Sequence, residues 1–130
     1  MDLIELVYSN IFLKRLFPAG ISEPVFIGQI NFDVGPRMSV HIHTKQRPAI
    51  EIDKWGKWGV DYDIVVIHLH GFCRGLACLK NWKNADYAPL IVTGNAETLT
   101  ISQRGTNWSI ELECESLIFN GCSTYINGAE

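Results

Sequence analysis

The sequence predicts a mainly β (α+β) domain in which one N-terminal helix precedes about eight mostly antiparallel strands. Apolar residues recur at helical spacing over residues 2–17, and from residue 25 onwards the apolar period changes to two. The breaks between the later apolar segments contain turn residues and are too short for crossover helices. Short connections favour antiparallel pairing, so the sheet is expected to fold over as a sandwich or a partly closed barrel.

The expected helix covers residues 2–17, with Asp2 and Glu5 as a variant capping box and Pro18 and Gly20 after its end. Two strands, residues 25–34 and 37–43, form a hairpin around Gly35-Pro36. The segment 45–62 is too irregular for a paired strand, and it contains the repeat Lys54-Trp55-Gly56-Lys57-Trp58-Gly59. The remaining expected strands are residues 63–72, 76–82, 89–93, 98–102, 108–115 and 117–126.

Length and composition indicate one globular domain over residues 1–130. The formal net charge is -3, which disfavours non-specific nucleic-acid binding, because that affinity comes mainly from Lys and Arg. A basic partner fits better. No apolar run approaches the roughly 18 to 20 residues of a membrane-spanning helix, so no membrane partner is expected. The first residues, Met1-Asp2-Leu3-Ile4-Glu5, are acidic where a signal peptide is basic, and we expect a cytoplasmic protein.

The four cysteines lack any C-x-x-C pair and have no obvious base beside them in the sequence. Without an export signal their expected state is the reduced thiol. We therefore expect Cys73, Cys78, Cys114 and Cys122 to be inert.

All four histidines occur in H-x-H pairs, His41/His43 and His68/His70. Spacing by two places both members of a pair on the same face of a strand. If the two strands were neighbours, four imidazoles could surround a zinc ion. The alternative is that these are ordinary outward-facing polar positions, since H-x-H alone lacks the further ligands of a zinc signature. We predict no metal site, with these histidines as the only candidates.

Three glutamates, Glu111, Glu113 and Glu115, alternate with apolar residues along one expected strand. Such a row is commonly a solvated face. Like charges in one row repel, however, and a basic partner that neutralises them would offset this repulsion. The row is our first candidate for a partner-binding surface.

Asp61 and Asp63 flank Tyr62 just after the tryptophan repeat, which places a second acidic group beside large aromatic side chains. An exposed Trp58 ringed by acids would suit a binding hot spot. Core packing is the alternative, and it is expected for at least one of Trp55 and Trp58. We take Asp61, Asp63 and Trp58 as further partner-binding candidates.

No pattern in the sequence indicates catalysis. A Gly-rich phosphate loop, a G-x-S-x-G elbow and an H-E-x-x-H motif are all missing. Paired carboxylates occur, but nothing separates their environments as an acid/base pair requires. We expect no catalytic residues, no cofactor and no enzymatic activity.

Several short motifs follow one another along the chain. They are Phe12-Leu13-Lys14-Arg15-Leu16-Phe17, strands at 30–34 and 37–43, Lys54-Trp55-Gly56, Tyr62-Asp63-Ile64-Val65-Val66-Ile67-His68-Leu69, a strand closing on Trp82, and Ser123-Thr124-Tyr125-Ile126-Asn127. In this order they resemble immunity protein family 50, small bacterial proteins that protect against polymorphic toxins. The resemblance covers most of the chain, although Asp63 stands where the family pattern usually has Asn, and the doubled Trp-Gly also departs from it.

This resemblance implies a protein that binds a cognate toxin domain, of the nuclease type, and occludes its active site without catalysis. An acidic, cofactor-free domain suits a basic active site. Two alternatives remain. One is a carbohydrate or small-ligand module built around Trp55, Trp58 and Trp82, and the other is a zinc enzyme that uses the H-x-H pairs.

Overall fold

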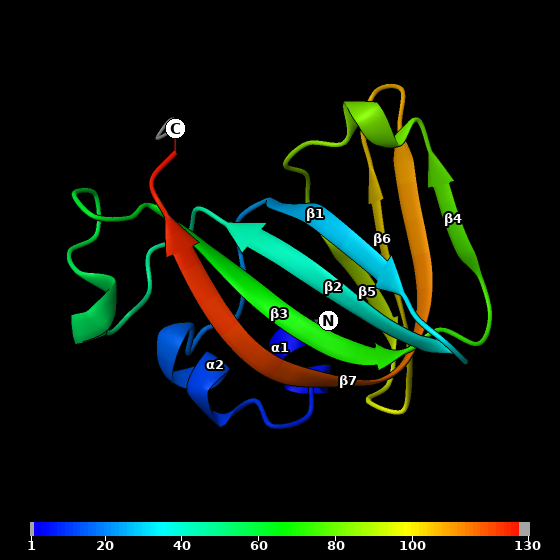
Figure 1. The fold of residues 1–130 in the computed structure, drawn as a ribbon, viewed down its shortest axis with the longest axis horizontal. Coiled ribbons are helices and arrows are strands. Elements are labelled where there is room, and N and C mark those ends of the chain that lie inside the picture. The colour runs from blue at the N-terminus through cyan, green and yellow to red at the C-terminus, as the bar shows by residue number, and fades with distance from the viewer. Residues whose placement is uncertain (1, 128–130) are drawn as a thin grey trace.

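The computed structural model describes residues 2–127 and contains seven strands and two short α-helices. The strands are β1 (Val25–Phe32), β2 (Arg37–Thr44), β3 (Ile64–Phe72), β4 (Ala77–Lys80), β5 (Ile91–Gly94), β6 (Thr98–Arg104) and β7 (Ser109–Tyr125). They form one antiparallel sheet in the order β1-β2-β3-β7-β6-β5, and β4 pairs with β7 outside this path. The mainly β prediction is confirmed (Figure 1).

The predicted helix over 2–17 is wrong as one element, because the chain forms α1 (Leu3–Leu6) and α2 (Ile11–Leu16). Between them, Tyr8 leaves the helical path and pairs with β7. Its N–H donates to the Leu117 carbonyl at 2.8 Å, and its carbonyl accepts from the Phe119 N–H at 3.0 Å. Ser9 then turns the chain with a φ of 59°. Pairing with a sheet edge replaces the hydrogen bonds that a continuous helix would have made.

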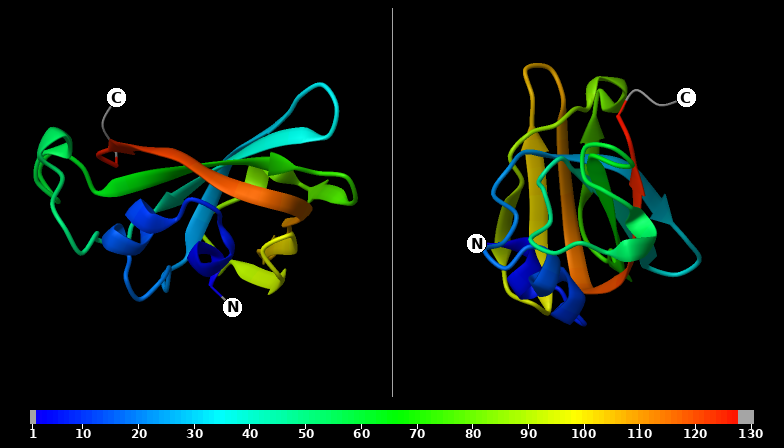
Figure 2. Two further views of the ribbon diagram at one scale, coloured as in Figure 1. Left: turned by 90° about the horizontal axis from the view of Figure 1, so that it is seen from below. Right: turned by 90° about the vertical axis from the view of Figure 1, so that its left-hand side faces the viewer.

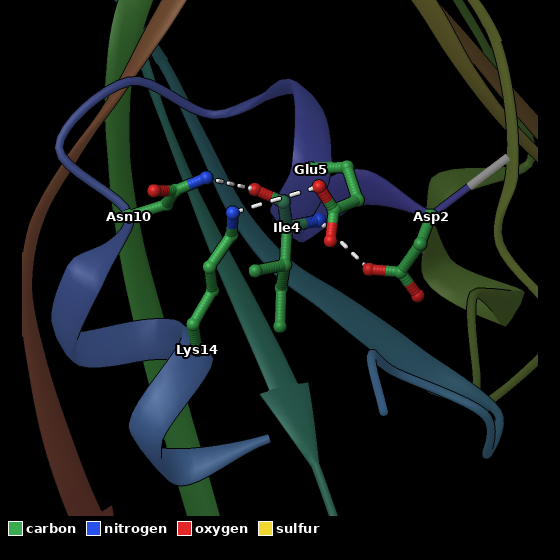
Figure 3. A network of polar contacts seen from close by, with 5 residues as sticks. All are labelled: Asp2, Ile4, Glu5, Asn10 and Lys14. Atoms are coloured by element: carbon green, nitrogen blue, oxygen red, sulfur yellow. Dashed lines mark hydrogen bonds and ion pairs between the residues drawn. The ribbon is translucent and has the colours of Figure 1, made fainter. Parts of the chain in front are cut away.

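Side chains cap α1 and link the two helices (Figure 3). Asp2 is the N-cap of α1, and its carboxylate accepts from the Ile4 N–H at 2.9 Å. The Asn10 amide donates to the Ile4 carbonyl at 2.8 Å, and Lys14 pairs with Glu5 at 3.6 Å. The predicted N-cap is therefore confirmed. Glu5, the second residue of the predicted capping box, instead forms an ion pair with Lys14 of α2.

The two strands predicted over 108–115 and 117–126 are one strand, β7, so there are seven strands where eight were expected. Ser116 adopts a φ of 53° and bends β7 without ending it. Gly71 of β3 lies against this bend, since a Cβ atom there would lie 2.9 Å from the Glu115 carbonyl oxygen. The first half of β7 pairs with β4 and β6, and its second half pairs with β3.

The bend folds the sheet over so that β5 and β6 lie behind β1 and β2 (Figure 1). The sheet is not a closed barrel. Val25 of β1 and Ala88, just before β5, form an isolated antiparallel bridge between the two ends of the sheet. Buried Gln103 reinforces the bridge, because its amide donates to the Val25 carbonyl at 2.8 Å and to the Ala88 carbonyl at 2.9 Å.

The core lies between the two halves of the folded sheet, and α1 and α2 cover it from one side (Figure 2). The inward strand positions are almost fully buried, and so are Leu3, Ile4, Leu13 and Leu16 of the helices. Within residues 2–127, no helix is both long enough and apolar enough to cross a bilayer.

Replacement of Gln103 by Ala should lower the free energy of unfolding by about 2 to 4 kcal/mol, because it removes two buried hydrogen bonds and leaves a cavity. Gln103→Met keeps most of the volume and should have a smaller effect. Urea denaturation measures both, with Ser102→Ala on the opposite face of β6 as the control. A Gln103→Ala protein as stable as this control would contradict the role of the bridge.

Candidate functional site

The sheet has an outer face, which lies on the side away from the core, and the bend in β7 divides this face into two areas. We call the area over β4, β6 and residues 109–115 of β7 the glutamate face. The area over β1, β2, β3 and residues 118–125 of β7 is the histidine face. These two areas contain most of the predicted site residues.

The glutamate face presents the predicted acidic row. Glu111 and Glu113 are exposed and Glu115 is half-buried, while Ile110, Leu112 and Cys114, which alternate with them, are buried in the core. The predicted alternation is therefore confirmed. Arg74 pairs with Glu115, with its Nε 3.5 Å from the Glu115 Oε2. Among residues 2–127, neither Glu111 nor Glu113 has an ion-pair partner within 4.0 Å.

Neutral side chains flank the glutamates on the neighbouring strand β6. Ser102 lies opposite Glu111, Thr100 opposite Glu113 and Thr98 opposite Glu115. No acidic side chain thus lies directly across from another, which limits the repulsion to that along the row. Beyond Glu111 the face becomes basic, because Lys80 and Arg104 both pair in register with Ser109.

Asp61 and Asp63 lie at the opposite end of the sheet from the glutamates. Asp63 directly precedes β3, whose first residue Ile64 pairs with Tyr125. Tyr125 is ten positions beyond Glu115 in β7, roughly 30 Å along the strand at about 3.3 Å per residue. The acidic residues therefore do not form one patch, because the antiparallel pairing of β3 with β7 separates them.

Both aspartates bind backbone groups. An Asp61 carboxylate oxygen accepts from the Lys57 N–H at 2.7 Å, and an Asp63 oxygen accepts from the Asn127 N–H at 2.7 Å. The Asp61 carboxylate also lies directly against Gly56. Asp61 therefore has a structural role in the loop before β3, and Asp63 has one at the end of β7.

Trp58 packs against the protein. It is half-buried, and its ring meets that of buried Tyr62 edge-on at 5.4 Å between centroids. Trp55 meets Tyr62 at 5.9 Å and Phe12 at 6.1 Å, also edge-on. The prediction that at least one of these tryptophans packs on the core is confirmed for both. Trp82 lies apart from them, at the far side of the molecule, in the 3-10 turn 82–84 after β4 (Figure 1).

The histidine face brings all four histidines onto the neighbouring strands β2 and β3. His41 lies directly opposite His68, and their rings stack at 4.1 Å with an interplanar angle of 5°. His43 lies opposite Val66 and His70 opposite Ser39, so the four imidazoles follow a diagonal. Within residues 2–127, no three His, Cys, Asp or Glu side chains are grouped so that they could hold a metal ion.

Hydrogen bonds to β7 fix two of these rings. The Nδ1 of His43 is 2.8 Å from the Tyr125 hydroxyl, and the Nε2 of His68 is 3.0 Å from the Ser123 hydroxyl. Burial lowers the pKa of His43, and the neighbouring His41 and His68 lower it further. The pKa of His68 is lowered by burial first and then by His41 and His70. Both shifts favour the neutral form of these two imidazoles.

Aromatic side chains around His43 were not singled out by the sequence. Phe26 lies at 5.3 Å and Tyr125 at 5.6 Å from His43, ring centroid to centroid. Tyr87 packs on Phe26 at 5.7 Å, and the Lys45 ammonium lies 4.3 Å above the Tyr87 ring. Burial is the main cause that raises the Tyr87 pKa. Phe26, Tyr87 and Tyr125 come from distant segments of the sequence. The pairing of the strands brings them together, and no single motif in the sequence reveals it.

A hollow of about 440 Å³ lies where the outer face meets the tip of the β1–β2 hairpin, and it too was missed by sequence analysis. Figure 2 (left) shows this hairpin rising away from β3 and β7. Its lining combines apolar and polar side chains from four segments. They include Asn31, Arg37, Ser39, His70, Phe72 and Ile118.

Three of the four cysteines are not activated as nucleophiles. Burial raises the pKa of Cys114 to about 12 and that of Cys122 to about 12. The pKa of Cys73 is also raised, first by burial. A reactive thiolate needs a shift in the opposite direction. These directions support the expectation of inert thiols.

The chain matches no family model, no curated protein and no solved structure. The resemblance to immunity protein family 50 stays a prediction.

The histidine face should make stability sensitive to pH. The pKa values of His43 and His68 lie below the ordinary 6.5, so the unfolded chain binds protons more readily. The free energy of unfolding should therefore fall as the pH drops from about 6.5 through the folded pKa values. His41→Gln should lose less stability between pH 8 and pH 5 than the parent, by urea denaturation at each pH.

His70→Gln is the matched comparison, because His70 is a neighbour that lowers the pKa of His68, whereas His41 lowers both. Its effect should be smaller than that of His41→Gln. Equal losses of stability in the parent and in His41→Gln would rule out a contribution of His41 to the pH dependence, beyond that of burial.

Trp58→Ala should lower the free energy of unfolding by about 1 to 3 kcal/mol, because it removes apolar burial and an edge-on contact with Tyr62. An exposed anchor with no packing role would have almost no effect on stability. Trp82→Ala, at a side chain that is 39% exposed, serves as the comparison and should have the smaller effect. Urea denaturation at neutral pH decides between these roles.

Proposed function

We propose that this chain is an immunity protein, which binds a cognate bacterial toxin domain and neutralises it by occluding the active site. The observation that supports this most directly is the row Glu111, Glu113 and Glu115 on a sheet face that no other part of the described chain covers. The resemblance to immunity protein family 50 supports the same proposal. No catalytic step is required of this chain.

The row of glutamates on the glutamate face favours a basic partner. Glu111 and Glu113 take part in no ion pair in the described part of the chain, and the net charge of the chain is -3. The buried residues that alternate with them stabilise the fold without help from the carboxylates. Bringing Lys or Arg of a partner to this row would relieve the repulsion along it and accelerate association. Toxins that cleave nucleic acid need such basic residues to bind phosphates, so a nuclease-type toxin is the proposed target.

The interface would have the usual size for a specific complex, with roughly 1,200 to 2,000 Å² buried in total. The glutamates would set orientation and encounter rate, and apolar contacts nearby would supply most of the affinity. Asp61, Asp63 and Trp58, proposed as contacts from the sequence, are given structural roles by their packing and hydrogen bonds. We therefore centre the interface on the glutamate face.

The two alternatives are less favoured by the geometry. A carbohydrate module would place Trp55, Trp58 and Trp82 along one open cleft, but the first two pack on Tyr62 and Trp82 lies across the molecule. A zinc enzyme needs converging ligands, whereas His41 and His68 are stacked in parallel.

The double variant Glu111→Lys/Glu113→Lys should weaken binding to the toxin domain encoded beside this chain's gene. We expect an association rate at least about tenfold lower at low salt, because charge reversal removes electrostatic steering. Surface plasmon resonance over a series of salt concentrations measures this rate. Glu115 is left unchanged, since its pairing with Arg74 contributes to the local structure.

The matched control is Glu23→Lys/Glu51→Lys, which changes the net charge equally at two exposed loop positions outside the glutamate face. It should reduce the rate far less. Equal effects of the two double variants would show that only net charge matters and would refute the proposed interface. No complex between the parent and a folded toxin domain would refute the proposed function.

A further inference from the structure

We propose that the hollow at the tip of the β1–β2 hairpin receives an apolar side chain of the partner, flanked in the partner's sequence by Lys or Arg that reaches toward Glu113. This inference rests on the proposed function in taking the occupant to be a protein. The sequence analysis placed the anchor on this chain, at Trp58. We now place the anchor on the partner, and this chain supplies the concave site that receives it.

The hollow has the size and form of a binding site. Its volume of about 440 Å³ falls within the range of ligand pockets, roughly 300 to 1,000 Å³. Its lining residues come from the β1–β2 hairpin, from the end of β3 and from Ile118 of β7. β1, β2 and β3 are paired in one ladder, which holds most of these residues in place.

The chemistry of the walls suits an apolar side chain with a polar rim. Phe72 is half-buried and Ile118 is 43% exposed, and both line the hollow. Asn31, Ser39 and His70 lie side by side in the ladder and offer hydrogen-bonding groups at one side. An apolar centre within a polar rim is the usual anatomy of an energetic hot spot.

The charges around the hollow select a basic segment. The two arginines nearby are paired with carboxylates of this chain, Arg74 with Glu115 at 3.5 Å and Arg37 with Asp33 at 3.9 Å. Arg74 also lies over the Phe72 ring, with its Cζ 5.6 Å from the ring centroid. Glu113 follows on the same face two positions before Glu115, and it has no ion pair among residues 2–127.

The hollow and the glutamate face are continuous. Phe72 pairs in register with Glu115, so the apolar wall of the hollow adjoins the acidic row. A partner loop that places an aromatic or aliphatic side chain over Phe72 and Ile118 would carry its next residues across Glu115 toward Glu113. Apolar anchoring and charge complementarity would then act on one short segment.

A synthetic probe tests the hollow without the toxin. The acetylated and amidated tripeptide Lys-Trp-Lys is titrated into ¹⁵N-labelled protein, and amide shifts are followed. The largest saturable shifts should fall at Ser39, His70, Phe72 and Ile118. Glu-Trp-Glu and Lys-Gly-Lys should each shift them much less. Shifts centred elsewhere, or equal shifts with Glu-Trp-Glu, would overturn the inference.

Two variants test the hollow in the complex. Ser39→Tyr fills it, and Ile118→Ser removes an apolar wall without adding bulk. Each should raise the Kd for the toxin domain roughly tenfold or more, mainly through faster dissociation. Val60→Tyr, the same kind of enlargement at a side chain that is 70% exposed in the loop before β3, should leave the Kd unchanged.

The outcomes separate the two proposals. A toxin complex unaffected by both variants would overturn the hollow as the anchor site while the proposed function stands. Peptide shifts mapping to the hollow, together with no toxin complex, would overturn the immunity function and support the hollow as a site for a basic, apolar segment.

Discussion

The shared strand β7 is the constraint on which the rest of the structure depends. One strand of 17 residues pairs with β4 and β6 along its first half and with β3 along its second. The left-handed Ser116 lets it change direction without losing its partners, and the absence of a side chain at Gly71 lets β3 approach the bend. Without this bend the core would have only one wall.

The same bend organises the surface. The outward side chains of β7 are the glutamates before Ser116 and, after it, Ile118, Ser123 and Tyr125, with a second register shift between Phe119 and Gly121. One half of the outer face thereby carries the glutamate row, with Lys80 and Arg104 beyond Glu111, and the other is rich in histidine and aromatic rings. The hollow lies at the boundary, where Phe72 meets Glu115. Charge and apolar surface thus adjoin where a partner would need both.

Local patterns in the sequence were sufficient for the period-two strands, the Asp2 cap and the burial of Cys114 between glutamates. They were insufficient where contacts between distant segments determine the structure. The helical spacing of residues 2–17 is real, yet Tyr8 is taken by the edge of β7, which lies more than 100 positions away. Asp61 and Glu115 were both predicted from the sequence as acidic partner-binding residues, but the antiparallel register of β3 on β7 places them far apart. The hollow depends on that register too, so no motif reveals it.

The position of β7 in the chain also bears on how the domain forms during synthesis. It is the last strand of the sheet to emerge from the ribosome, and β3, β4 and β6 all wait for it as a partner. Until then β1, β2 and β3 can pair with one another and β5 with β6, but β4 has no partner strand and the core is not enclosed. Completion of the sheet therefore depends on the last strand, and truncation of that strand would remove the pairing that joins the earlier strands.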